Sequence, residues 1–129
     1  MSMASIVNRV NRRIDTQIRK STIELFGSVI KMTPVDTGRA KGNWQCTIGS
    51  PAKSEIERLD KTGSSALSDV VSTVKSGTVV WLGNNVPYIS RLEYDSWSKQ
   101  APAGMVRVSL ARFGAMFSEA ASASMSQIK

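Results

Sequence analysis

Apolar residues recur every four positions near the start of the chain, at Ile6, Val10, Ile14 and Ile18. This spacing is the period of an amphipathic α-helix. The stripe drifts but continues through Leu25, Phe26, Val29 and Ile30. We predict a helix from Ser5 to Met32, with Ser2 or Ser5 as its cap. At 1.5 Å per residue it would be about 40 Å long, longer than a small domain is wide, so we expect one part to project.

The segment Thr33–Arg39 separates this helix from a different kind of sequence. Pro34 lacks an amide donor and disfavours the α conformation at Thr33, so the helix should end near Met32. The side chains of Asp36 and Thr37 can accept hydrogen bonds from nearby amides, and Gly38 can take a positive φ. Pro34, Asp36, Thr37 and Gly38 therefore predict a tight structural turn.

Strand and helix patterns then alternate along the chain. Residues 43–48 alternate polar and apolar side chains, and residues 78–82 are rich in β-branched and aromatic ones, so each segment predicts a strand. Residues 64–75 and 88–97 place apolar side chains at helical spacing, with Ile89, Leu92 and Trp97 turned to the core in the second. From Pro102 onward, a stripe through Val106, Leu110, Phe113 and Phe117 predicts a last helix. The residues thus predict one domain with a basic helix (1–32), strands and short helices (33–100), a C-terminal helix (101–125) and a frayed tail (126–129).

Positive charge is concentrated near the N-terminus. The 129-residue chain has 17 Lys and Arg against 10 Asp and Glu, a formal charge of +7. The polar face of the predicted first helix holds five of the cations: Arg9, Arg12, Arg13, Arg19 and Lys20. They indicate a contact with nucleic acid, a membrane surface or an acidic protein, or a solvated face. Membrane binding is disfavoured because the apolar stripe carries no Trp and no bulky aromatic before Phe26.

The sequence holds few groups suited to catalysis. There is no His, and the lone Cys46 has no base to activate it. Glu55, Glu57 and Asp60 are interspersed with Lys and Arg in a polar loop, so we interpret them as a solvated surface. Phosphate-binding glycine patterns and zinc-type cysteine spacings are missing. We therefore predict a protein that is not an enzyme and uses no cofactor or metal, made in a cytosol and without a membrane span.

A face of small side chains lies on the predicted last helix. Its members are Ala111, Ala115, Ser118 and Ser122. Such a face allows close approach of another helix or subunit, although a surface of short side chains has the same composition. We keep it as a possible subunit interface.

Three sequence segments resemble segments of the tail-completion or neck proteins of tailed phages, which include minor tail and head-tail joining components. The first is Thr33–Arg39 after a long N-terminal helix, followed by Ala40 and Trp44. The second is Asn85-Val86-Pro87-Tyr88-Ile89 with Leu92-Glu93-Tyr94. The third is Ala101–Arg107 at the entry to the last helix. The resemblance spans nearly the whole chain.

The resemblance implies an α+β fold in which a long N-terminal helix and a C-terminal helix flank a small twisted antiparallel sheet. It also implies a structural virion protein at the head-tail junction or head-proximal tail, commonly a homo-oligomeric ring around the DNA channel. We then expect the basic residues of the first helix to face genomic DNA or an acidic surface of a neighbouring neck or tail protein. The alternative is a stand-alone basic nucleic-acid-binding protein or an assembly factor.

Overall fold

The computed structural model describes residues 2–75, 77–95, 97–101 and 103–113. Within them the elements follow in the order α1 (Met3–Met32), α2 (Arg39–Gly42), β1 (Gln45–Ile48), α3 (Ser64–Thr73), β2 (Val80–Gly83) and α4 (Ile89–Tyr94). Residues 106–113 are also helical. The predicted α+β class, with a long first helix and a small antiparallel sheet, is confirmed.

The first helix starts and ends through local interactions that the sequence indicated. The Ser2 hydroxyl accepts a hydrogen bond from the Ser5 amide at 3.1 Å, so Ser2 is the cap. At the other end Thr33 takes an extended conformation before Pro34. The Thr33 hydroxyl donates to the Val29 carbonyl at 2.7 Å and accepts from the Trp44 indole at 2.7 Å. One side chain therefore ends α1 and fastens it to the residue before β1.

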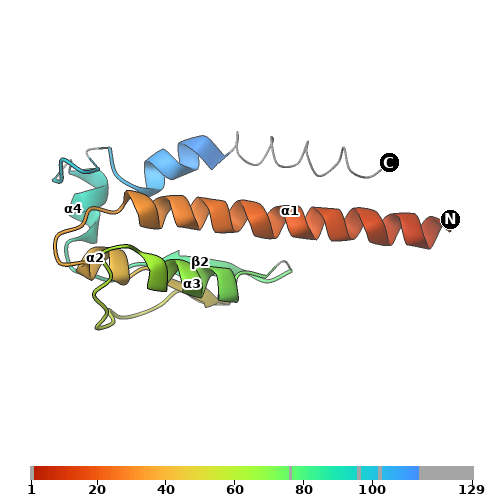
Figure 1. Ribbon diagram of the computed structural model, residues 1–129, viewed down its shortest axis with the longest axis horizontal. Coiled ribbons are helices and arrows are strands. Elements are labelled where there is room, and N and C mark those ends of the chain that lie inside the picture. The colour runs from red at the N-terminus through yellow and green to blue at the C-terminus, as the bar shows by residue number, and fades with distance from the viewer. Residues whose placement is uncertain (1, 76, 96, 102, 114–129) are drawn as a thin grey trace.

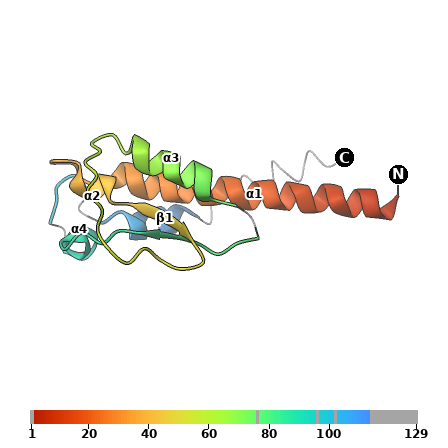
Figure 2. The ribbon, with the colours of Figure 1, turned by 90° about the horizontal axis from the view of Figure 1, so that it is seen from below.

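The two strands pair antiparallel, with Gln45 opposite Gly83 and Ile48 opposite Val80. Figure 1 shows α1 between the 106–113 helix on one side and α3 and the sheet on the other. Figure 2 shows α3 lying along α1. The N-terminal part of α1 extends beyond this body (Figure 1). The first helix therefore both anchors the core and projects from it, as its predicted length required.

The core gathers residues from the C-terminal part of α1 and from the elements packed against it. Its buried members are Val29, Ile30, Ala40, Trp44, Ala66, Val70, Val74, Val86, Leu92, Ala101 and Met105. Partly buried Ile23, Phe26, Leu82 and Ile89 pack around them. No residue before Ile23 belongs to this cluster as described, which leaves the projecting part of α1 outside the core.

Several predicted positions differ from the structure. The second strand is Val80–Gly83 instead of 78–82, and α3 ends at Thr73 instead of residue 75. Trp97 is 56% exposed, because α4 ends at Tyr94 and does not carry the Trp97 ring inward. Asn43 is buried and lies before the strand. Its side-chain Nδ2 donates to the Arg39 carbonyl, and its side-chain Oδ1 accepts from the Ile56 amide. The last helix starts at residue 106, later than predicted, because Gly104 takes a φ of +88° just before it. Pro102 itself lies outside the described residues.

Candidate assembly surfaces

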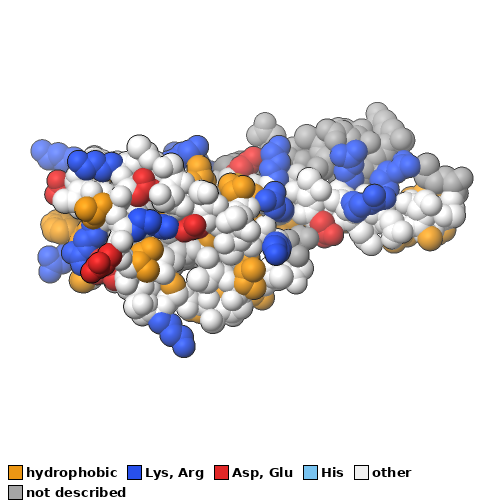
Figure 3. Space-filling model, turned by 60° about the horizontal axis from the view of Figure 1, so that its bottom comes forward, with side chains coloured by type: hydrophobic (Ala, Val, Ile, Leu, Met, Phe, Trp, Pro, Cys, Tyr) orange, Lys and Arg blue, Asp and Glu red, His pale blue; other side chains and the backbone are white. Residues whose placement is uncertain are grey.

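The projecting part of α1 leaves large apolar side chains uncovered. Met3 is 76% exposed, and the exposed fractions of four further side chains lie between 42% and 48%: Ile6, Val7, Ile14 and Ile18. Figure 3 shows hydrophobic and basic side chains together along this part of the molecule. Scattered exposed apolar residues are ordinary, but a row on one projecting helix is typical of an interaction surface.

The five predicted basic residues divide into two groups. Arg12 and Lys20 are exposed, while Arg9 and Arg13 are partly covered. Arg19 instead reaches across to the end of α3, where its guanidinium donates to the Val71 carbonyl at 2.9 Å and to the Val74 carbonyl at 3.1 Å. These carbonyls lie at the C-terminal end of a helix, where a cation is favourable. Arg19 is therefore placed as a structural cap, whereas the other four remain on the projecting segment.

The Thr33–Arg39 segment connects α1 to α2 and bends at residues 36–38. Gly38 has a φ of +88°, and the Thr37 hydroxyl accepts a hydrogen bond from the Arg39 amide at 3.3 Å. The Gly38 carbonyl accepts from the Gly42 amide at 2.8 Å and from the Asp60 amide at 3.0 Å. A side chain at position 38 would place its Cβ 2.8 Å from the Asp60 nitrogen. The turn is thus pressed against residues 58–61 of a later loop.

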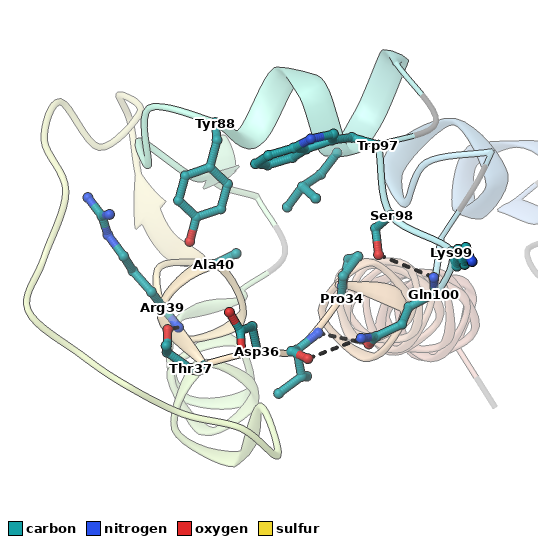
Figure 4. A pocket seen from close by; sticks show the side chains of 13 residues that line it. Pro34, Asp36, Thr37, Arg39, Ala40, Tyr88, Trp97, Ser98, Lys99 and Gln100 are labelled. Carbon is teal, nitrogen blue, oxygen red and sulfur yellow. Dashed lines mark hydrogen bonds between the residues drawn. The ribbon is translucent and has the colours of Figure 1, made fainter.

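A groove of about 620 Å³ joins this turn to α4 and the residues after it. One wall is formed by residues 34–40, including Pro34 and Asp36, and the other by Tyr88, Leu92 and residues 97–100. The Gln100 side chain closes one end by donating to the Val35 carbonyl at 3.1 Å and accepting from the Val35 amide at 2.9 Å (Figure 4). Two of the sequence segments that resemble phage proteins, Thr33–Arg39 and residues 85–94, therefore meet at one surface.

Tyr88, Trp97 and Arg39 are among the residues that line this groove, and Arg91 contacts the Trp97 ring from outside that set. The Tyr88 and Trp97 rings lie 5.8 Å apart at 60° (Figure 4). The guanidinium of Arg39 lies 5.5 Å from the Tyr88 ring, and that of Arg91 lies 5.7 Å from the Trp97 ring. These are distances at which cation–π attraction operates.

Arg39 also forms an ion pair with Glu55. One of the two hydrogen bonds, from Nη2 to Oε1, is 2.7 Å long. The hydrogen bond from Arg39 lowers the pKa of the Glu55 carboxyl below its ordinary value. The pair links the turn to the 52–59 loop, so the arginine of the turn helps to hold the groove wall in place.

The polar loop that was interpreted as a solvated surface is partly structural. Asp60 is only 8% exposed, and its carboxylate accepts hydrogen bonds from the amides of Gly63 and Ser65 at 3.0 and 2.8 Å. Burial raises the pKa of Asp60, but these hydrogen bonds outweigh it and hold the pKa below its ordinary value. Asp60 therefore satisfies amides at the start of α3, and the solvated interpretation was wrong for this residue.

Sequence reasoning missed the role of Glu93, which is 7% exposed. Its carboxylate accepts hydrogen bonds from three consecutive amides, those of Met105, Val106 and Arg107, at 2.7–2.9 Å. Burial raises the pKa of Glu93, but the amide hydrogen bonds outweigh it and the pKa is lowered. The sequence did hold one signal for this role. Met105, just before the helix, has no side-chain oxygen, so the first helix amides need an acceptor from elsewhere in the chain.

The predicted small-residue face is only partly visible. Ala111 is exposed on the 106–113 helix. Ala115, Ser118 and Ser122 lie outside the described residues. The proposed interface therefore keeps one placed member, and the rest of it stays a prediction.

The described ranges contain no group of three or more His, Cys, Asp or Glu side chains placed to hold a metal ion. Among the helices of the same residues, none has both the length and the apolar character required to cross a membrane. Cys46 is half-buried, and burial raises the pKa of its thiol. A raised thiol pKa disfavours the reactive thiolate.

Comparisons with protein-family models, curated proteins and solved structures found no match for this chain.

Proposed function

We propose that the chain is a structural virion protein of a tailed bacteriophage that completes the tail or neck and joins head to tail. It would act as one subunit of a homo-oligomeric ring around the DNA channel, assembled in the cytoplasm of the bacterial host. The support is the resemblance of three sequence segments to segments of such phage proteins, and two of these segments meet at the groove between the turn and α4. The proposed role is mechanical, and it needs no cofactor.

The observation that carries the proposal is the exposed apolar row on the projecting part of α1. Fully burying an exposed large aliphatic side chain contributes about 1.5–3 kcal/mol, and four side chains of this row are 42–48% exposed, so covering each of them would contribute about half of that. A projecting element on one end of a subunit suits a head-to-tail contact with the next copy, and repeated head-to-tail contacts form a ring when the rotation between copies closes. The face that begins at Ala111 is our candidate for the opposite side of that contact.

Loss of the protein gives the functional test. An amber mutation in the gene should yield filled heads and separate tails in lysates of a non-suppressing host, viewed by negative-stain electron microscopy. Supplying the intact gene in trans should restore joined particles, which is the control for polar effects on neighbouring genes. Joined particles at normal yield without the protein would contradict a joining role and favour a free DNA-binding protein.

A further inference from the structure

The cations of the projecting helix share one continuous polar face. Successive residues of an α-helix are about 100° apart, so Arg9, Arg12, Arg13 and Lys20 fall within a sector of about 100°. We call this sector of residues 2–20 the basic face. Its remaining members carry hydroxyl groups that bond locally: those of Ser2 and Ser5 bond to each other, and that of Thr16 donates to the Arg12 carbonyl. It runs along the helix for about 16 Å between Arg9 and Lys20.

The chemistry of this face fits phosphate better than protein. Contacts to a nucleic-acid backbone come mainly from Arg and Lys, with Ser and Thr hydroxyls among the usual donors. Protein interfaces, in contrast, depend on apolar or aromatic anchors at their centre. The basic face has no such anchor, because the apolar side chains of this segment lie on other sides of the helix. A surface of cations without an apolar centre suits a partner that offers regularly spaced anions.

The same face points to duplex rather than single-stranded nucleic acid. Proteins that bind single strands stack the bases on aromatic side chains. Residues 2–25 contain no aromatic residue. The basic face can therefore neutralise phosphates but has nothing on which to stack an unpaired base.

We propose that the basic face of α1 binds the phosphate backbone of duplex DNA without reading its sequence. Arg9, Arg12 and Lys20 supply the contacts, and Arg13 lies on the same face. Arg19 takes no part, because it caps α3. This inference rests on the proposed function, because it names the partner of a ring subunit's projecting helix. Its test uses the purified full-length protein.

The test is fluorescence anisotropy of a labelled mixed-sequence DNA duplex at several salt concentrations. Three phosphate contacts predict that log K falls with log salt with a slope of about −3. The double variant Arg12→Glu, Lys20→Glu should bind at least ~10-fold more weakly, with a slope shallower by about 2. The matched control is Lys53→Glu, Lys61→Glu, which makes the same change in net charge at two exposed positions of the body loop. The control should bind nearly as the parent does.

Three results would overturn the proposal. The first is no salt-dependent binding by the parent protein. The second is equal weakening by both double variants, which would assign binding to overall charge. The third is tighter binding to poly-glutamate than to the duplex, which would favour an acidic protein partner. A neck protein whose first helix does not touch DNA would show no salt-dependent DNA binding but would still be found in virions. The DNA-binding proposal can therefore fail while the proposed virion function holds.

Discussion

Replacing Glu93 by Ala should lower the free energy of unfolding by about 3–5 kcal/mol, because three buried or half-buried amides and Arg107 lose their acceptor. Glu93→Gln keeps the shape but loses the charge, so we expect a smaller loss of about 1–3 kcal/mol. Chemical denaturation followed by circular dichroism measures both values. The matched control is Glu57→Ala at an exposed position, which should change stability by less than about 0.5 kcal/mol.

The same contacts predict how the effect depends on pH. The pKa of Glu93 is lower in the folded protein than its ordinary value, so the ionised carboxylate stabilises the fold. This contribution is fully present above the unfolded-state pKa and is lost as the pH falls through the lower folded-state pKa. The stability difference between the parent and Glu93→Gln should therefore be largest at neutral pH and shrink in acid. A difference that does not change with pH would show that the Glu93 charge contributes nothing.

Replacing Gly38 by Ala should destabilise the protein by about 3 kcal/mol. About 1–2 kcal/mol comes from placing an L-residue in the left-handed region. The rest comes from collision, because the new Cβ would lie 2.8 Å from the backbone nitrogens of Asp60 and Lys61. Relieving that collision lengthens the hydrogen bond from the Asp60 amide to the Gly38 carbonyl.

Gly49 provides a matched control for this substitution. Its φ is +85°, close to that of Gly38, but a Cβ there would meet no atom within 4 Å. Gly49→Ala should therefore show only the conformational cost of about 1–2 kcal/mol. Equal losses of stability for the two variants, measured by urea denaturation, would mean that the turn is not packed against residues 58–61 as described.

Features set by neighbouring residues could be predicted from the sequence. Ser2 caps α1, Pro34 follows its end and Gly38 takes a positive φ, and each of these depends on residues a few positions away. The periodic spacing of apolar residues likewise gave the long helix and its projecting part. Local chemistry therefore predicted the individual helices and strands and the projecting surface that carries the proposed function, whereas the α+β class was what the resemblance implied.

Features set by distant residues could not be predicted. Arg19 finds its acceptors 52 and 55 residues later, and Glu93 caps a helix that begins more than ten residues further on. A charged side chain in a mixed-sign sequence looks solvated until the packing of the chain brings a helix end to it. For this reason the sequence predicts a solvated Asp60 and a partner or DNA contact for Arg19, and it indicates no role for Glu93.

Quantitative mass spectrometry of purified virions tests the central claim most directly. If the chain is a ring subunit of the neck or tail, it should be present in several copies per particle, in a fixed ratio to the other neck and tail proteins. Its absence from complete, infectious particles would contradict the claim.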